Sequence, residues 1–190
     1  MEITPHTLQE PLSLPPSLYS SVVIAEAKKD GQTLLLRVGL DRELVRQLKE
    51  RSLDESDEAV QSNTSDRKRF GEGSYEGWYS GNRTPFALVD TSGRLAALAW
   101  FGPKDAPIAE KEEALWHTIA YRSYPPYRGA GIMGDFTRFV LEYYRRLIPG
   151  VRIWAEVKAG NTASVALAKK LGFEERAPLL GRAHGVILTD

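Results

Sequence analysis

Residues 127–134, with the sequence YRGAGIMG, form a glycine-rich segment just before the strongest helical pattern in the chain. Glycine has no Cβ, so Gly129 and Gly131 allow backbone N–H groups to turn toward a ligand. The helix that follows adds unpaired N–H donors and the positive end of its dipole. This combination predicts a binding site for a phosphate or diphosphate, and a tight turn without a ligand is the alternative.

The same glycines match the dinucleotide-binding pattern Gly129-x-Gly131-x-x-Gly134. Glu156 lies 22 residues beyond the last glycine, near the place where an acid would hold a ribose hydroxyl. However, this pattern requires a strand that runs directly into the first glycine, and prolines at 125–126 would end the strand early. Only 56 residues follow the last glycine, which leaves little room for a doubly wound sheet. An NAD- or FAD-binding oxidoreductase therefore stays as an alternative.

Strands and helices must alternate around this loop to position it. β-rich runs cover 22–26, 33–38, 86–90, 95–101, 115–121, 151–157, 173–176 and 185–189, and helical spacing of apolar residues predicts helices over 41–52, 132–147 and 162–171. Residues 54–58 are an acidic run, read as a solvated helix end or a second helix. Residues 70–81, FGEGSYEGWYSG, are predicted as a loop whose aromatic side chains pack on the core or form a wall over a substrate cleft. This order predicts a single α/β (α+β) domain.

Composition excludes several classes of site. The 190 residues include 25 Lys+Arg and 25 Asp+Glu, and the zero net charge argues against nucleic acid or an anionic membrane as partner. Without cysteine there is no thiol nucleophile, disulfide or Cys-ligated zinc. His6, His117 and His184 show no metal-ligand spacing, so no metal is expected. Residues 1–20 are a Pro-rich arm without the basic start of a secretory signal, which predicts a cytoplasmic protein.

Two segments together resemble the GNAT acyltransferase superfamily. TIAYRSYPPYRGAGIM, at 118–133, is similar to the strand, turn and helix in which Arg/Gln-x-x-Gly-x-Gly/Ala opens the helix. IWAEVKAGNTASVALAKKLGF, at 153–173, is similar to the second motif, and it looks nearest to enzymes that acetylate protein N-termini, of the ribosomal-protein alanine type. The resemblance implies one domain over 21–190, with a mixed sheet of six to seven strands, splayed parallel central strands and four helices.

The resemblance also implies that acetyl-CoA binds between the splayed strands. The residues it assigns to this co-substrate are Tyr121, Arg122 and Ser123 on the strand, Arg128, Gly129, Ala130, Gly131, Met133 and Gly134 in the loop, and Asn161 and Ser164 at the next helix. Strand backbone would contact the pantetheine and loop amides would cradle the diphosphate, while Asn161 could instead serve as a helix N-cap. Met133 departs from the Gly or Ala that the family prefers, which would shift the turn toward Gly134. Ala168 stands where many members have a Tyr that protonates the leaving thiolate.

Attack of an amine on a thioester needs a base, because an amine is protonated at neutral pH. The family places one catalytic side chain 11 residues before the motif Arg, which is His117 here, and a second just before the motif Val, which is Glu156. We expect these two side chains to share one water, with Glu113 as a third candidate. The alternatives are a core histidine, and a buried ion pair between Glu156 and Arg128 or Arg152.

The sequence therefore predicts an acetyl-CoA-dependent N-acetyltransferase that acts directly on a primary amine. The acceptor would be a protein or peptide α-amine or a small-molecule amine, and the enzyme a monomer or homodimer. Two alternatives stay open: the oxidoreductase described above, and a non-catalytic acyl-CoA-binding module suggested by the departures at Met133 and Ala168.

Overall fold

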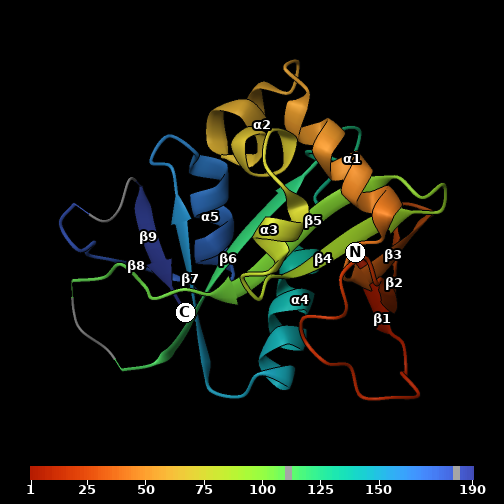
Figure 1. Ribbon diagram of the computed structural model, residues 1–190, viewed down its shortest axis with the longest axis horizontal. Helices are drawn as coiled ribbons and strands as arrows, with labels where there is room; N and C mark the ends of the chain where they lie inside the picture. Colours follow the sequence, from red (N-terminus) through yellow and green to blue (C-terminus); the bar gives the residue numbers. More distant parts are fainter. Residues whose placement is uncertain (110–112, 182–184) are drawn as a thin grey trace.

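A mixed β-sheet with helices on both faces organises the chain (Figure 1). The computed structural model describes residues 1–109, 113–181 and 185–190. The strands are β1 (Glu2–Pro5), β2 (Val22–Lys29), β3 (Gln32–Val38), β4 (Thr84–Asp90), β5 (Leu95–Pro103), β6 (Leu115–Ser123), β7 (Val151–Val157), β8 (Glu174–Arg176) and β9 (Val186–Thr189). The helices are α1 (Arg42–Leu53), α2 (Glu58–Asn63), α3 (Tyr75–Tyr79), α4 (Met133–Leu147) and α5 (Thr162–Lys170), with a π-helical turn, η1 (Arg67–Gly71), between α2 and α3. The strand order across the sheet is β1-β2-β3-β4-β5-β6-β7-β9-β8.

Alternating side chains of β5 divide the core into two layers. Ala99 and Phe101 pack with Phe136 of α4, in the layer that also receives Ala168 of α5. Their neighbour Trp100 packs in the other layer, with side chains of α1, α2 and α3. Because successive residues of a strand point to opposite faces, the odd-numbered residues of β5 from Ala97 onward face α4 and α5, and the even-numbered ones face α1–α3.

β6 and β7 are the parallel pair of the sheet, and they separate partway along their length. Their register covers only residues 115–118 opposite 151–154. Beyond it, β6 stays paired with β5 as far as Ser123, and β7 stays paired with β9 as far as Val157. The β7-facing backbone of residues 119–123 therefore has no strand partner in the described ranges. The resulting gap, called the fork below, confirms the splayed parallel strands that the sequence predicts.

Local signals explain the helices that border the fork. Asp41 caps α1, and its Oδ1 accepts a hydrogen bond from the Leu44 N–H at 3.0 Å. In α4, Phe136, Val140 and Tyr144 repeat every four residues and are all buried. The predicted helices over 41–52, 132–147 and 162–171 are therefore confirmed to within one or two residues.

The structure differs from the sequence-based expectation in two places. The sheet has nine strands rather than six or seven, because residues Glu2–Pro5 of the Pro-rich arm pair with β2 at one edge and the short β8 lies at the other. Residues 70–81 were expected to be a loop, but they contain the end of η1 and all of α3. Ser74 caps α3 by accepting from the Gly77 N–H at 3.1 Å. Phe70, Tyr75 and Tyr79 are buried and Trp78 packs against them, so the aromatic side chains pack on the core as predicted. No helix in the described ranges is long and apolar enough to cross a membrane.

Candidate active site

The fork opens into a cleft with a volume of about 380 Å³. Its walls come from residues of β5, β6 and β7, including residues of both faces of the sheet where the fork opens, from the segment after α2, and from the first residues of α5. The predicted residues Tyr121, Arg122, Glu156, Asn161 and Ser164 all line it. The structure therefore brings the strand and helix parts of the predicted site into one space.

The glycine loop adopts a conformation suited to an anion. Gly129 and Gly131 have left-handed φ angles of +79° and +71°, which favour glycine. No acceptor among the described residues binds the N–H groups of Gly129 or of residues 131–134, and no side chain caps α4. Lys29 of β2 adds a positive charge, since its Nζ would lie 3.9 Å from a Cβ on Gly131. These donors and this cation fit the diphosphate of a coenzyme.

Two details of the predicted loop need correction. The N–H groups of Arg128 and Ala130 donate to the carbonyl oxygens of Tyr124 and Tyr127, at 3.1 and 3.2 Å, so they are not free for a ligand. Met133 and Gly134 lie inside α4, and both left-handed residues come earlier. The turn is therefore not shifted toward Gly134.

The Arg128 side chain ties the loop to the helical layer. Its Nη1 and Nη2 donate to Oδ1 and Oδ2 of Asp57 at 2.6 and 2.7 Å, and Nη2 also donates to the Ser123 carbonyl oxygen at 2.9 Å. Burial opposes ionisation of Asp57, but the hydrogen bonds from Arg128 and the Val60 N–H hold its pKa below the usual value. Arg128 thus pairs with Asp57 rather than with Glu156, and it already occupies the Ser123 carbonyl oxygen. The acidic run at 54–58 is not fully solvated, because the Asp57 side chain is only 3% exposed.

Three predicted residues connect β6 to α5 across the fork. Asn161 caps α5, with its Oδ1 accepting from the Ser164 N–H at 3.2 Å. The Tyr121 hydroxyl donates to the Ser164 carbonyl oxygen at 2.9 Å, and burial raises the pKa of Tyr121 to about 12. Asn161 therefore serves as the N-cap, and it also lines the cleft that a pantetheine chain would enter.

His117 and Glu156 lie on opposite faces of the sheet. His117 pairs with Ile153, which packs in the α4 layer, and its Nδ1 is hydrogen bonded to the Tyr144 hydroxyl of α4 at 2.7 Å. Glu156 pairs with Ile187, which lies on the opposite face with Trp154, and it lines the cleft. An odd and an even position in aligned strands cannot face the same side. The expectation that these two side chains share one water is therefore wrong.

The remaining predicted groups are more distant from the cleft. Glu113 is exposed just before β6, at the paired end of the strands, and it is not part of the cleft lining. His184 and the acidic residues at 110 and 112 lie outside the described residues. Among the candidates for a base, Glu156 is the one that the structure places in the cleft.

Arg122 was among the predicted residues, but sequence reasoning missed four other basic residues that line this cleft, Arg69, Arg83, Lys104 and Lys158, and the buried carboxylate of Asp66 that pairs with two of the cleft's arginines. Asp66 is fully buried and forms ion pairs with Arg122 of β6 and, at 3.1 Å, with Arg69 of η1. Burial lowers the pKa of Arg122 to about 10, which leaves it protonated at neutral pH. Arg83, just before β4, also lines the cleft. No local pattern could reveal these contacts, because the partners of Arg122 come from a distant turn.

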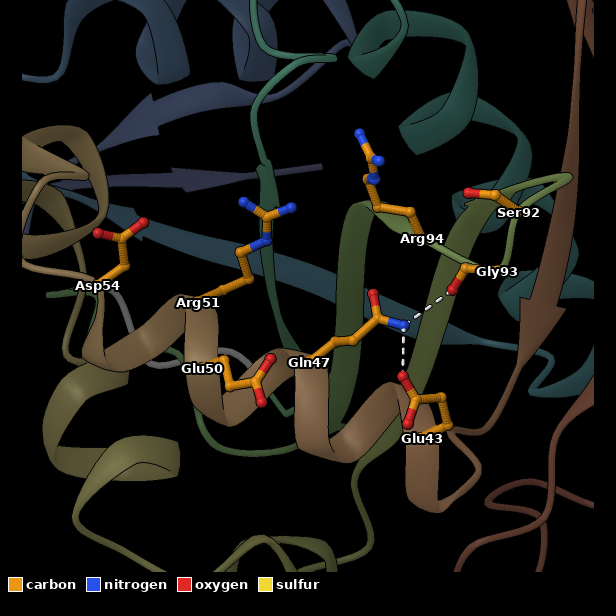
Figure 2. A pocket seen from close by; sticks show the side chains of 8 residues that line it. All are labelled: Glu43, Gln47, Glu50, Arg51, Asp54, Ser92, Gly93 and Arg94. Carbon is orange, nitrogen blue, oxygen red and sulfur yellow. Dashed lines mark hydrogen bonds between the residues drawn. The ribbon is translucent and has the colours of Figure 1, made fainter.

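A second cavity lies between α1 and the turn that joins β4 to β5 (Figure 2). Gln47 spans it, since its Nε2 donates to the Gly93 carbonyl oxygen at 2.9 Å and its Oε1 accepts from the Leu95 N–H at 2.8 Å. No residue of β6, β7 or the glycine loop lines this cavity. Gln47 therefore links α1 to the turn between β4 and β5 across this cavity, which gives the cavity a structural role.

The acetyltransferase (GNAT) domain family model matches residues 25–174. The chain therefore belongs to the GNAT acetyltransferase family, and it is an N-acetyltransferase. This confirms the resemblance noted in the two sequence motifs. The sheet, with a single parallel pair among its described strands, is not the doubly wound sheet that an NAD- or FAD-binding enzyme of the Gly129-x-Gly131-x-x-Gly134 type would require.

Solved structures of the same fold are distant in sequence. The GNAT domain of S. lividans PAT is 17% identical, with a TM-score of 0.64 and coverage of 87% of this chain and 96% of that one. Spermidine N-acetyltransferase from Vibrio cholerae, in complex with CoA and spermine, is 17% identical, with a TM-score of 0.60 and coverage of 82% and 92%. Ribosomal-protein-S5-alanine acetyltransferase from Vibrio fischeri is 14% identical, with a TM-score of 0.55 and coverage of 87% and 95%. No protein with a curated description matches the chain.

Replacing Gly131 with Val should weaken acetyl-CoA binding at least about tenfold, because a β-branched residue at φ +71° distorts the loop amides. Gly150→Val is the matched control, since Gly150 has φ +77° and lies in the turn between α4 and β7. Both variants carry similar backbone strain, but only Gly131→Val should change the Kd in calorimetry. Equal Kd values for both variants would show that the loop does not hold the diphosphate.

His117 should make stability depend on pH. Burial and the positive charge of Arg83 lower its pKa in the folded protein, whereas an unfolded histidine titrates near ~6.5. As pH falls from ~6.5 toward the folded pKa, the unfolded chain binds protons that folded His117 does not, so stability decreases in that window. Melting curves between pH 7.5 and 5.5 should show a smaller loss for His117→Gln than for the wild type. His6→Gln, at an exposed position, should keep the wild-type slope; the same slope in His117→Gln would contradict the assignment.

Proposed function

We infer that the chain transfers an acetyl group from acetyl-CoA directly to a primary amine. The observation that carries this proposal is the continuity of two features: a glycine loop with unused amide donors, and a fork that begins on the strand leading into that loop. The loop would hold the diphosphate and the fork would receive the pantetheine, with Asn161 at its rim. The acceptor would enter from the cleft on the α1–α3 face.

In this proposal Glu156 acts as the general base for the acceptor. The amine nitrogen attacks the thioester carbonyl carbon, the carbon–nitrogen bond forms and the carbon–sulfur bond breaks. Glu156, directly or through a water, takes the proton that the amine loses. The leaving thiolate takes up a proton from water, and in this proposal backbone N–H groups of the open β6 edge stabilise the oxyanion.

The names of the structural neighbours suggest the reacting group of the acceptor. The structural neighbours include enzymes named for spermidine and for the alanine of a ribosomal protein, and both acceptors are primary amines. We propose the same reacting group here, on a peptide α-amine or a small molecule.

Calorimetric titration with acetyl-CoA, followed by a CoA-release assay with a panel of amines, tests the proposal. We expect saturable binding of acetyl-CoA and acetyl-dependent CoA release with at least one amine. Absence of heat and of any thermal shift at millimolar acetyl-CoA would refute it. Binding without CoA release across the panel would instead favour a non-catalytic acyl-CoA-binding module, the alternative that Ala168 suggests.

A further inference from the structure

The cleft beside the fork is strongly cationic. Among the described residues, five basic side chains line it, Arg69, Arg83, Lys104, Arg122 and Lys158, and Glu156 is the one acidic side chain. A protein of zero net charge has no general reason to collect cations in one cavity. The charge of this cleft is therefore a local feature that acts on whatever enters it.

Buried Asp66 neutralises only part of this charge. It pairs with Arg122 and with Arg69, but no carboxylate among the described residues lies within 4.0 Å of Arg83, Lys104 or Lys158. Lys104 packs over the Trp154 ring at 5.0 Å, and Lys158 donates to the Ser62 carbonyl oxygen at 2.5 Å. An aromatic ring and a carbonyl oxygen carry no net negative charge, so these contacts do not neutralise Lys104 or Lys158.

Among these cations, Arg83 is the one whose position and unused N–H donors are best suited to binding a ligand. Its guanidinium lies across Gly102 of β5, where a Cβ would come within 2.4 Å of the Arg83 Nη1. Glycine at 102 thus makes the room that the side chain occupies. The Arg83 guanidinium donates to no described group and is half-buried, so its planar donors are available to a ligand.

Arg83 is too far from the coenzyme loop to serve the diphosphate. Gly102 pairs with Thr118, at the closed end of the fork, whereas the loop follows Ser123. Ser123 lies five positions beyond Thr118 along β6, which corresponds to roughly 16 Å at about 3.3 Å per residue. Arg83 therefore lies on the acceptor side of the cleft.

We propose that the acceptor is a small primary amine that also carries a carboxylate or phosphate group, and that Arg83 binds this anion while the amine faces Glu156. The proposal rests on the proposed function and specifies its acceptor. A guanidinium binds both anions through paired N–H donors. A polycation such as spermidine would meet repulsion from Arg83, Lys104 and Lys158.

Steady-state kinetics with matched amines tests this inference. 4-Aminobutyrate is compared with butylamine, O-phosphoethanolamine with ethanolamine, and spermidine is included as a polycation. We expect kcat/KM to be at least about tenfold higher for the anionic member of at least one pair, and the difference to shrink as salt rises. The pair with the larger difference identifies the anion as carboxylate or phosphate.

Arg83→Gln should raise the KM for the anionic acceptor at least about tenfold, with the Kd for acetyl-CoA unchanged. Arg83→Lys should recover part of the loss, and Arg94→Gln, at an exposed arginine in the cavity of Figure 2, should match the wild type. If Arg83→Gln does not fold, Arg83→Lys and the salt dependence of the wild type provide the same test.

The outcomes separate the two proposals. Equal or better turnover of neutral amines or spermidine, or unchanged discrimination in Arg83→Gln, would overturn the anionic acceptor while leaving the acetyltransferase intact. Acetyl-CoA binding without turnover of any anionic amine would also count against it. Failure to bind acetyl-CoA would refute the proposed function itself.

Discussion

Glu156→Gln should lower kcat about 100-fold while the Kd for acetyl-CoA stays within about twofold of the wild type. Glutamine keeps the size of the side chain and its place in the cleft, but it cannot accept the proton of the attacking amine. Loss of a positioned base costs roughly 10²–10⁴ in rate. Single-turnover assays of acetyl transfer, together with calorimetry for acetyl-CoA, measure the two quantities separately.

The pH profile distinguishes a base from a structural role. If Glu156 removes the proton, raising the pH should partly restore kcat in Glu156→Gln, because a larger share of the amine is then already neutral. Glu142→Gln, at an exposed position on α4, should behave like the wild type at every pH. His117→Gln should keep most of its kcat, since His117 lies on the other face of the sheet. Unchanged turnover in Glu156→Gln would remove the base assignment.

Asp66→Asn should destabilise the fold by about 3–5 kcal/mol, because removing one partner of a buried ion pair leaves an uncompensated charge. Asp66 is completely buried and the Arg122 side chain is 8% exposed, so water cannot replace the lost partner. The same change leaves Arg69 without its carboxylate. For a chain of this size, such a loss lowers Tm by roughly 10 °C.

Chemical denaturation and thermal melting of Asp66→Asn measure this loss. Glu43→Gln is the control, because Glu43 pairs with Arg46 at 2.6 Å on the surface of α1, and exposed pairs contribute little. The control should melt within about 1 °C of the wild type. The double variant Asp66→Leu with Arg122→Met should regain part of the stability of Asp66→Asn, since it removes both buried charges. A Tm for Asp66→Asn equal to that of the control would contradict the assigned ion pair.

The features that the sequence predicted are those with local signals. Glycines at 129 and 131, the apolar stripe of α4 and the Asn161 cap each depend on residues within a few positions, so pattern alone located the loop and both flanking helices. The face on which His117 and Glu156 lie depends on strand register, which a single residue offset reverses.

Contacts between distant segments could not be predicted in this way. Arg128 meets Asp57 across 71 positions of sequence, and Asp66 meets Arg122 across a helix, a turn and two strands. Nothing in the local composition of η1 indicates that Arg69, among its three basic residues, lines a cavity. The cationic character of the acceptor side therefore emerged only from the three-dimensional arrangement.

The Arg128–Asp57 ion pair connects the glycine loop to α2, and so the proposed coenzyme site to the wall of the acceptor cleft. Asp57 is the N-cap of α2, and Asn63, at the other end of that short helix, borders the cleft. Because Arg128 binds both carboxylate oxygens of Asp57, the position of the glycine loop is linked directly to the position of α2, whose other end borders the cleft.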